Sequence, residues 1–306
     1  MQVHFIINSN AGNGRGIKRW EQFKQDLTFP YTAHWTQYAG HTLLIVKEIT
    51  ERATKENPVC LIAIGGDGTV HEVLNGVLHF EHVYIGVIAA GSGNDFARGF
   101  ETFKTSKQLE QFIKDPTRSL HDYGSATFND TSKYFINNFG VGFDAFVAMK
   151  ANESKLKKML NKWKLGKLSY PYYVISALFT YKPFQLTVIL DGKEKQYKNV
   201  WFTTVSNQPY FGGGMKLSPT SNTSDGTLEV TVVSDLSKWK LLFVFGSVFF
   251  AKHTGMRELH QFSTHSIQLF FEEPIMAHAD GEKQKLQQGM NTIKISVHQK
   301  AWNLAK

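Results

Sequence analysis

The stretch Cys60-Leu-Ile-Ala-Ile-Gly-Gly-Asp-Gly-Thr-Val-His-Glu-Val-Leu-Asn-Gly76 decides the fold of this chain. Residues 59–64 form a short apolar run without a polar face, which predicts a buried strand of a mostly parallel sheet. Three glycines follow within four residues, and from 70 to 78 the apolar residues recur with helical spacing. A strand, a glycine-rich turn and a helix in this order predict an α/β unit.

The glycine-rich turn is suited to phosphate. Backbone N–H groups at a helix N-terminus bind phosphate oxygens, and glycines let the backbone approach a polyanion closely. Asp67 lies within the turn and would repel a bare phosphate, so we predict that Mg²⁺ lies between its carboxylate and the phosphates. The turn alone is also consistent with a tight strand-to-helix connection in which Thr69 caps the helix.

A second stretch repeats this pattern. Residues 85–89 predict another strand, and Gly91-Ser-Gly-Asn-Asp-Phe-Ala-Arg98 follows it, with Asp95 as its acid. Because open α/β sheets bind ligands at the carboxyl ends of their strands, we expect the two turns to converge there.

Composition restricts the class of protein. The chain has 306 residues, enough for two domains, and no apolar run approaches the ~20 residues of a membrane span. The longest run, 241–251, predicts a buried helix. The single cysteine, Cys60, excludes disulfides, and the first residues predict a strand rather than a signal peptide, so we expect a cytoplasmic protein. A net charge of +8 indicates a polyanionic partner: a nucleotide, a nucleic acid or an anionic membrane surface.

Both turns, together with Glu72 and Asn75-Gly76, resemble the soluble lipid kinases of the diacylglycerol kinase catalytic-domain family. The resemblance implies an N-terminal Rossmann-like α/β nucleotide-binding domain, similar to NAD kinases and phosphofructokinases, and a C-terminal β-sandwich domain. After His121-Asp-Tyr-Gly124 the pattern changes to strands in hairpins. We therefore predict that 1–122 with 299–306 form the first domain and that 123–298 form a lipid-binding second domain.

The resemblance also implies ATP as the phosphate donor and Mg²⁺ as its partner, with Asp67 and Asp95 near that ion. The residues that match the nucleotide-binding motifs of the family are Asn8, Gly12, Arg15, Thr36, Gly65, Gly66, Gly68, Thr69, Glu72, Asn75, Gly91, Ser92, Gly93 and Asn94.

The first of these motifs follows the first predicted strand. It is neither a Walker A loop nor a well-spaced Gly-x-Gly-x-x-Gly, so by itself it is also consistent with a plain loop. It resembles the family's Asn-Pro-x-[Ser/Ala]-Gly loop with Ser9 in place of the proline, and the planar fork of Arg15 suits phosphate oxygens. Thr36-Gln-Tyr-Ala-Gly-His41 is similar to the family's Thr-x-x-x-Gly-His element, in which His41 either begins a helix or contacts the nucleotide.

The motif His278-Ala-Asp-Gly-Glu282 supplies the base implied by the resemblance. Glu282 matches the catalytic glutamate of the family's Asp-Gly-Glu. A carboxylate is needed there because the acceptor hydroxyl has a high pKa and must lose its proton as it attacks phosphorus. Asp280 is expected to orient this loop or a metal. Without the resemblance, Asp-Gly-Glu is an ordinary turn.

A structural metal site is implied by the segment 220–230. Asp225 matches the aspartate that holds a structural Mg²⁺ in the family, and Asn222 and Thr227 are candidates for the carbonyl ligands. The same Asp-Gly pair is also typical of a hairpin turn.

A basic segment at 150–167 carries seven lysines and one glutamate around apolar residues at helical spacing. Such a helix suits an anionic membrane surface, or it packs its apolar stripe on its own domain.

These expectations combine into a lipid kinase, peripheral to an anionic membrane, that transfers the γ-phosphate of ATP to the hydroxyl of a diacylglycerol-like lipid. The oligomeric state stays open, and a homodimer is consistent with the resemblance because the family is often dimeric. One alternative is an NAD kinase-like phosphotransferase with a soluble hydroxyl substrate, and another is a non-catalytic membrane-binding protein. No aromatic-basic RNA motif occurs, so no nucleic-acid partner is expected.

Overall fold

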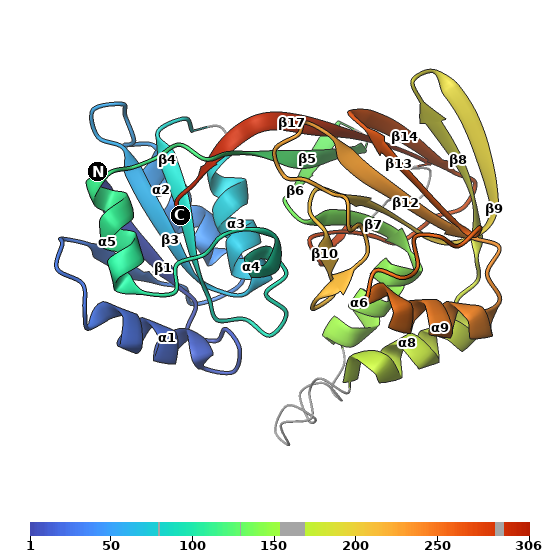
Figure 1. The fold of residues 1–306 in the computed structure, drawn as a ribbon, viewed down its shortest axis with the longest axis horizontal. Helices are drawn as coiled ribbons and strands as arrows, with labels where there is room; N and C mark the ends of the chain where they lie inside the picture. The colour runs from blue at the N-terminus through green and yellow to red at the C-terminus, as the bar shows by residue number, and fades with distance from the viewer. Residues whose placement is uncertain (79, 129, 154–168, 285–290) are drawn as a thin grey trace.

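The computed structural model describes the whole chain except residues 79, 129, 154–168 and 285–290. The chain forms two layered domains that lie side by side and are connected by the long last strand (Figure 1). The prediction of a basic helix over 150–167 falls mostly outside the described residues.

The first domain is built on a parallel sheet. Its strands β1 (Gln2–Ile7), β2 (Thr32–Trp35), β3 (Val59–Gly65) and β4 (Val83–Ala89) pair in the order β2-β1-β3-β4. The helices of this domain are α1 (Arg15–Lys24), α2 (His41–Thr50), α3 (Asp67–Val77), α4 (Phe96–Gly99) and α5 (Ser106–Lys114). This α/β order confirms the predicted class of the domain.

Strand β3 lies at the centre of this domain, and all seven of its residues are buried. Alternate side chains point to opposite faces of a strand, so β3 contributes to two cores. Leu61 and Ala63 pack in the core beneath α2 and α3, whereas Ile62 and Ile64 pack in the core beneath α1 and α5. Strand β3 has no polar residues on either face because a hydrophobic core covers each face of the sheet.

The second domain is mostly antiparallel. Its strands are β5 (Leu120–Phe128), β6 (Thr131–Phe135), β7 (Asn138–Gly142), β8 (Phe184–Leu190), β9 (Lys193–Ser206), β12 (Leu228–Ser234), β13 (Leu259–Thr264), β14 (Ser266–Phe271), β15 (Ala277–Ala279), β16 (Glu282–Gln284) and β17 (Thr292–Leu304), with a small separate hairpin of β10 (Tyr210–Phe211) and β11 (Met215–Lys216). Helices α6 (Phe143–Glu153), α8 (Ser169–Thr180) and α9 (Lys238–Val248) lie together on one side of it (Figure 1). The β-sandwich class is confirmed.

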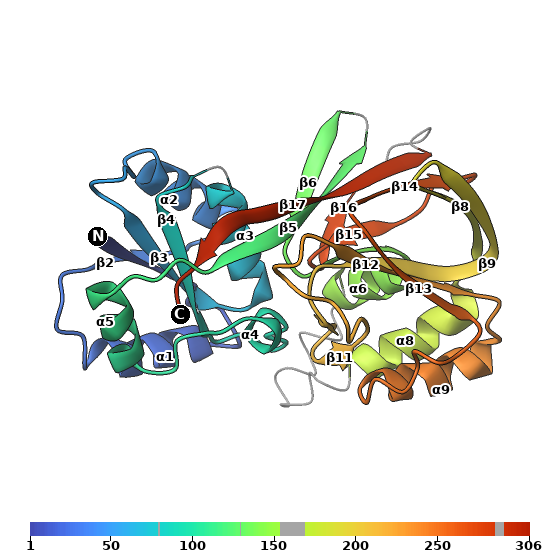
Figure 2. The ribbon, with the colours of Figure 1, turned by 45° about the horizontal axis from the view of Figure 1, so that its top comes forward.

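Strand β17 belongs to both domains. It pairs antiparallel with β5 and β14 along most of its length, and the register on β5 shifts between His298 and Trp302. Beyond this shift, Asn303 and Leu304 pair in parallel with β4 of the first domain. Figure 2 shows β17 and β5 running together from one domain to the other. The end of the chain thus extends the first sheet, while the exact domain boundaries stay a prediction.

Candidate active site

A pocket of about 370 Å³ opens at the carboxyl ends of β1, β3 and β4. Of the residues assigned to the nucleotide from the sequence, those that line it are Asn8, Gly12, Thr36, Gly66, Gly68, Thr69, Glu72, Gly91 and Ser92. The lining residues that sequence reasoning did not assign are Asn10, Ala11, Gln37, Tyr38, Ala39 and Thr42. Except for Thr42, which lies in the first turn of α2, they are in the same loops as assigned residues, between the positions that match a motif.

The floor of the pocket is backbone packed on backbone. A Cβ added to Gly91 would lie 2.4 Å from Gly66 Cα, and a Cβ added to Gly12 would lie 2.2 Å from the carbonyl oxygen of Ala90. Side chains at these positions would force the three loops apart. The glycines therefore bring three strand ends close enough to form one surface of peptide groups, which suits a phosphate chain.

Side chains fix the loops around this floor. Asn8 Nδ2 donates to Thr69 Oγ1 at 2.9 Å, and Arg15 Nη2 donates to Ser92 Oγ at 3.2 Å. Glu72 Oε1 accepts from the backbone N–H of Gly40 at 2.9 Å. Thr69 is inside α3 rather than at its N-cap, which is Gly66 and has no capping side chain. The alternative of a threonine-capped connection is therefore wrong, and the first N–H groups of α3 stay available for an anion.

Five assigned residues do not line the pocket: Gly65, Asn75, Gly93, Asn94 and Arg15. Asn75 Nδ2 donates to the carbonyl oxygen of His71 at 2.9 Å, one turn away on α3. Asn94 has a left-handed backbone (φ 55°), and its side chain donates to the carbonyl oxygen of Gly91 at 3.1 Å. These contacts shape the loops, and a nucleotide role for these residues stays a prediction.

Two carboxylates meet beside the pocket. Asp67 Oδ1 accepts from the N–H of Phe96 at 2.9 Å, and Asp95 Oδ2 accepts from the N–H of Gly213 in the second domain at 2.7 Å. A Cβ added to Gly93 would lie 2.9 Å from Asp67 Oδ2 and 3.9 Å from Asp95 Oδ2, so both acids border the same glycine.

Burial makes both carboxylates resist ionisation. Burial raises the pKa of Asp67, although the N–H groups of Phe96 and Asn94 partly oppose the rise. Burial also raises the pKa of Asp95 to about 6, against the hydrogen bond from Gly213, and the charge of Asp67 adds to the rise. Two buried acids with raised pKa values are a donor set that a hard divalent cation would stabilise.

The chemistry of this pair fits Mg²⁺. Mg²⁺ is commonly held by one or two carboxylates, with phosphate oxygens and water as its other ligands. Among the described residues no group of three or more His, Cys, Asp or Glu side chains is arranged to hold a metal. An ion at Asp67 and Asp95 would therefore depend on the nucleotide for part of its coordination shell.

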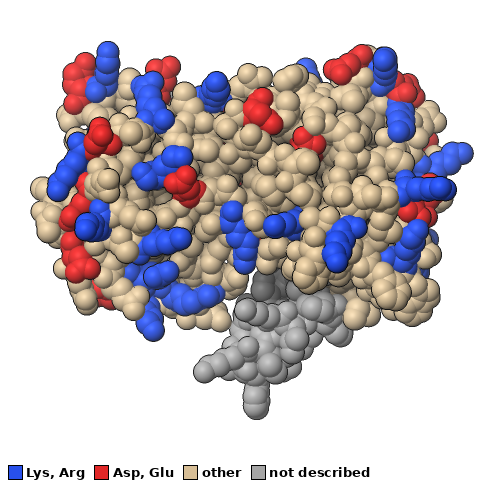
Figure 3. Space-filling model, viewed as in Figure 1, with Lys and Arg blue, Asp and Glu red and all other residues tan. Residues whose placement is uncertain are grey.

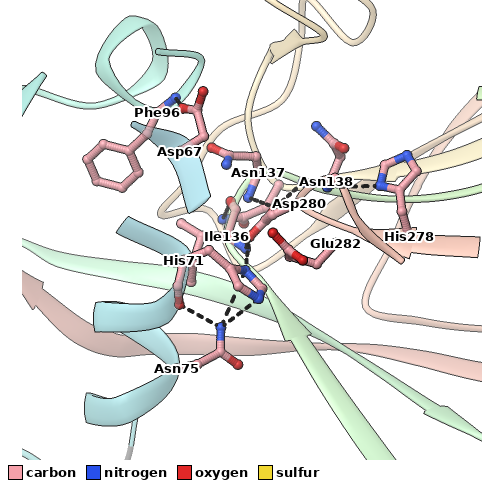
Figure 4. A network of polar contacts seen from close by, with 12 residues as sticks. Asp67, His71, Asn75, Phe96, Ile136, Asn137, Asn138, His278, Asp280 and Glu282 are labelled. Carbon is pink, nitrogen blue, oxygen red and sulfur yellow. Dashed lines mark hydrogen bonds and ion pairs between the residues drawn. The ribbon is translucent and has the colours of Figure 1, made fainter. Parts of the chain in front are cut away.

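The turn between β15 and β16 brings the second domain to this pocket (Figure 4). The Asp280 side chain is completely buried and accepts hydrogen bonds from the N–H groups of Ile136, Asn137 and Asn138 at 2.8 to 3.0 Å. It also pairs with His71 Nδ1 of α3 at 2.9 Å. The prediction that Asp280 orients its loop is confirmed, and its partner His71 was missed because 209 residues separate the two.

The charges of this pair support each other. Burial by itself raises the pKa of Asp280, but the hydrogen bond and charge of His71, together with backbone N–H groups, lower it overall. Burial by itself lowers the pKa of His71, but Asp280, with smaller contributions from Glu282 and Glu72, raises it overall. The pair is thus a hydrogen-bonded link between the two domains in which the charged form of each residue favours the charged form of the other.

Glu282 lies two residues beyond this link and is exposed to solvent. A Cβ added to Gly68 would be 3.8 Å from Glu282 Oε1, so this carboxylate lies directly over the start of α3. The sequence assigned Glu282 and Gly68 to one site, and the structure brings them together from different domains.

The loop with Asp225 lies elsewhere, beside β5 and β17. Asp225 Oδ1 accepts from the N–H and the hydroxyl of Thr227, both at 2.9 Å, and Asn222 Oδ1 accepts from Ser224. The buried Asp122 holds this loop, because its Oδ2 accepts from the N–H of Gly226 at 2.7 Å. Asp225 and Asn222 thus stabilise their own turns, and metal binding there stays a prediction.

This arrangement defines a class. A parallel α/β domain provides a glycine-floored pocket and two acids, and a β-sandwich domain places a further carboxylate over it. That is the architecture of two-domain kinases with an NAD kinase-like fold. A crystal structure of a Bacillus anthracis diacylglycerol kinase has the same fold, with a TM-score of 0.69 at 18% identity over 99% of this chain and 96% of that chain.

Residues 2–124 match the diacylglycerol kinase catalytic domain, and residues 137–297 match the YegS C-terminal NAD kinase beta sandwich-like domain. A Bacillus subtilis protein named "Putative lipid kinase YtlR" is 34% identical over 289 residues, which are 91% of this chain and 92% of that protein. A diacylglycerol kinase of Mycobacterium tuberculosis is 28% identical over 239 residues, or 77% of this chain and 74% of that protein. The chain belongs to the diacylglycerol kinase catalytic-domain family of lipid kinases.

Proposed function

We propose that this protein transfers the γ-phosphate of ATP to the hydroxyl of a diacylglycerol-like lipid, with Glu282 as the general base. One observation carries this proposal: Glu282 Oε1 reaches over Gly68, at the N-terminus of the helix that borders the phosphate pocket. A base in this position can accept a proton from a hydroxyl that attacks the terminal phosphate of a nucleotide bound below it.

The first domain would bind and orient the donor. The peptide groups at Gly66 and Gly91, with the uncapped N-terminus of α3, favour the negative charge of the phosphates. Arg15, which donates to Ser92 at the edge of the pocket, is placed to contact phosphate oxygens. Tyr38 lines the pocket and stacks on His41 with ring centroids 4.8 Å apart, which makes it our candidate for contact with the base of the nucleotide.

Asp67 and Asp95 would hold Mg²⁺, which neutralises charge on the phosphates when it is bound. These two acids also stay in place without the ion, because Phe96 and Gly213 donate to them. The second domain would deliver the acceptor. Asp280 holds the turn, and Glu282 removes the hydroxyl proton while the bond to phosphorus forms and ADP leaves.

A lipid acceptor is supported by the family and by the second domain itself. A small apolar cavity of about 40 Å³ lies beneath α6, α8 and α9, and its lining residues are Phe143, Asp144, Val147, Val174, Phe202, Phe211, Met215, Leu217, Leu241 and Val248. Asp144 is the one ionisable group among them, and its Oδ2 lies 3.3 Å from His278 Nε2 in the strand that leads to Asp280 and Glu282. Apolar walls with a polar end match the chemistry of a lipid, and the cavity would have to widen to admit an acyl chain, because ligand pockets typically measure about 300–1,000 Å³.

The test is transfer of labelled γ-phosphate from ATP–Mg²⁺ to mixed-micelle diacylglycerol, monoacylglycerol, phosphatidylglycerol, ceramide and a sphingoid base, with NAD as a soluble acceptor. We expect label on a lipid, and a loss of about 10²–10⁴-fold in Glu282→Gln because general base catalysis is removed. Glu273→Gln, which changes an exposed glutamate elsewhere in the domain, is the matched control. Label on NAD, or wild-type turnover in Glu282→Gln, would contradict the proposal.

A further inference from the structure

Helix α9 exposes large aromatic side chains, although its sequence predicted a buried helix. Leu241, Val244 and Val248 are buried in the core of the second domain, as expected for an apolar helix. Phe243, in contrast, is 82% exposed, and Trp239 is 66% exposed. Phe250, just after the helix, is 75% exposed. Trp239 and Phe243 lie four residues apart on α9 and therefore share one face, and Phe250 follows in the turn after the helix.

Helix α8 extends this exposed face. Its Val174 and Leu178 are buried against the same core, while Ile175 and Phe179 are 49% and 55% exposed. The rings of Phe179 and Trp239 meet edge to face with centroids 6.2 Å apart, and Lys238 Nζ lies 5.8 Å from the Phe179 ring. We call the set Ile175, Phe179, Trp239, Phe243 and Phe250 the aromatic face. These are large exposed apolar side chains on two neighbouring helices and the turn after α9, and monomeric proteins seldom leave a large apolar surface without a partner.

The charges around the aromatic face are mostly positive. The exposed cations at its borders are Lys182, Lys238, Lys240 and Lys252. The sequence has no acidic residue between Glu153 and Asp191 or between Asp235 and Glu258, the two stretches that contain α8 and α9. Lys240 forms an ion pair with Glu258. In Figure 3 the surface over α8 and α9, at the lower right, is mostly tan with blue side chains at its upper border.

We propose that the aromatic face docks on an anionic lipid bilayer. Aromatic rings at the surface of a helix enter the boundary between headgroups and acyl chains, and lysines beside them attract anionic lipids. Lysine also keeps its ammonium group in the headgroup region while its stem contacts apolar surface. A protein partner would need acidic residues to match this border, whereas an anionic membrane supplies negative charge everywhere.

This inference rests on the proposed lipid kinase activity. Docking on the membrane would bring the enzyme to its lipid substrate. The inner sides of the same helices line the apolar cavity of the second domain, through Val174 of α8 and through Leu241 and Val248 of α9. A lipid in the bilayer would therefore be separated from the cavity by one layer of helices. Docking places the second domain, rather than the nucleotide pocket, on the membrane.

Flotation of the full chain with phosphatidylcholine vesicles, with and without phosphatidylglycerol, tests the proposal without turnover. We expect binding to the anionic vesicles and a loss of roughly tenfold in Phe243→Ser, because one exposed phenylalanine no longer enters the membrane. Leu44→Ser is the matched control, since Leu44 is 60% exposed on α2 of the first domain. Lys238→Gln with Lys252→Gln should lose roughly tenfold on anionic vesicles, and Lys107→Gln with Lys114→Gln on α5 should not.

Turnover separates this inference from the proposed function. Phe243→Ser should slow phosphorylation of diacylglycerol in vesicles and leave phosphorylation of dispersed dioctanoylglycerol unchanged. If the wild type phosphorylates no lipid but the flotation results hold, the proposed function fails and the docking surface stands. Equal flotation of Phe243→Ser and wild type would overturn the docking, as would equal binding to neutral and anionic vesicles. A dimer that Phe243→Ser dissociates in the ultracentrifuge, without any change in flotation, would also overturn it by making the face a protein interface.

Discussion

The two sides of the candidate active site are built differently. On the first-domain side, each loop follows directly after a strand of one parallel sheet, and the pocket floor is backbone at Gly12, Gly66 and Gly91. On the second-domain side, the proposed base is a side chain, Glu282, on a turn held by hydrogen bonds from distant segments. The donor side is therefore fixed locally, whereas the acceptor side depends on how the domains dock.

Several polar contacts between the two domains lie next to the candidate active site. Asp280 pairs with His71 across the domains, and Gly213 donates to Asp95. The buried Gln208 Nε2 donates to the carbonyl oxygen of Tyr210 at 2.7 Å and lies 3.4 Å from that of Asp95. These contacts connect the position of Glu282, the proposed base, to the acids proposed to bind the metal. Substitutions on the two sides should therefore have different effects.

The largest effect is expected on the donor side. Asp67→Asn should lower kcat about 10²–10³-fold, since an amide cannot neutralise a cation beside the developing phosphate charge. The fold should persist, because the amide oxygen can still accept from Phe96. Steady-state turnover against Mg²⁺ concentration, with thermal unfolding as the check on folding, measures this. Asp26→Asn, at an exposed position of the first domain, is the control. Near-wild-type kcat in Asp67→Asn would remove this residue from the site.

On the acceptor side, loss of folding stability accompanies loss of activity. Asp280→Ala leaves three backbone N–H groups and His71 without their acceptor, so we expect the free energy of unfolding to fall by about 3–5 kcal/mol. Turnover should fall as well, because the Glu282 turn loses its anchor. Urea unfolding and ATP binding of Asp280→Ala and the wild type test whether the donor side forms independently of the acceptor side. Retained ATP binding with lost turnover would support a donor site that forms locally, and lost ATP binding would contradict it.

Much of the donor side could be predicted from the sequence because its causes are local. The buried run before Gly65 and the glycines after it specify strand, turn and helix without reference to the rest of the chain. The acceptor side could be predicted only through the resemblance, since Asp-Gly-Glu by itself is an ordinary turn. The partners His71, Gln208 and Gly213 lie in unrelated segments, so no spacing connects them.

The aromatic face was missed for a different reason. Apolar residues in a helix normally indicate burial, and hydropathy alone does not distinguish Phe243, which is exposed, from Val244, which is buried. Helical spacing contains that information: the residues of α9 that pack inward recur at 241, 244 and 248, and those that face outward recur at 239 and 243. One apolar stripe of a helix packs in the core of its domain, so a second apolar stripe indicates contact with another apolar environment outside the domain.

A smaller effect is expected from the charge of Asp95. Its folded-state pKa of about 6 lies above the ordinary value of 3.8, so the folded protein binds the proton more tightly. Stability should therefore fall as pH rises from about 4 to about 6 and stay lower above that range. Asp95→Asn should remove this loss and raise the free energy of unfolding at pH 7 by up to about 3 kcal/mol, while it lowers turnover.

Urea unfolding of Asp95→Asn and wild type between pH 4 and pH 7 measures this difference. Added Mg²⁺ with a nucleotide should reduce it, because the cation compensates for the charge of the wild-type carboxylate. If the free energy of unfolding changes with pH in the same way in the two proteins, the charged form of Asp95 is not destabilised by its surroundings.

The smallest effect is expected from neutralising the cross-domain ion pair. The pKa of His71 is raised in the fold, so its contribution is complete below its unfolded value of 6.5 and is lost as pH rises through the folded value. The pKa of Asp280 is lowered, so its contribution is complete above 3.8 and is lost as pH falls through its folded value. His71→Asn keeps a donor but removes the charge, and it should cost about 1–2 kcal/mol near pH 6 and less at higher pH. Urea unfolding of His71→Asn and wild type at pH 6 and pH 9 measures this cost. If the free energy of unfolding falls equally at both pH values, the link between the two sides is steric rather than ionic.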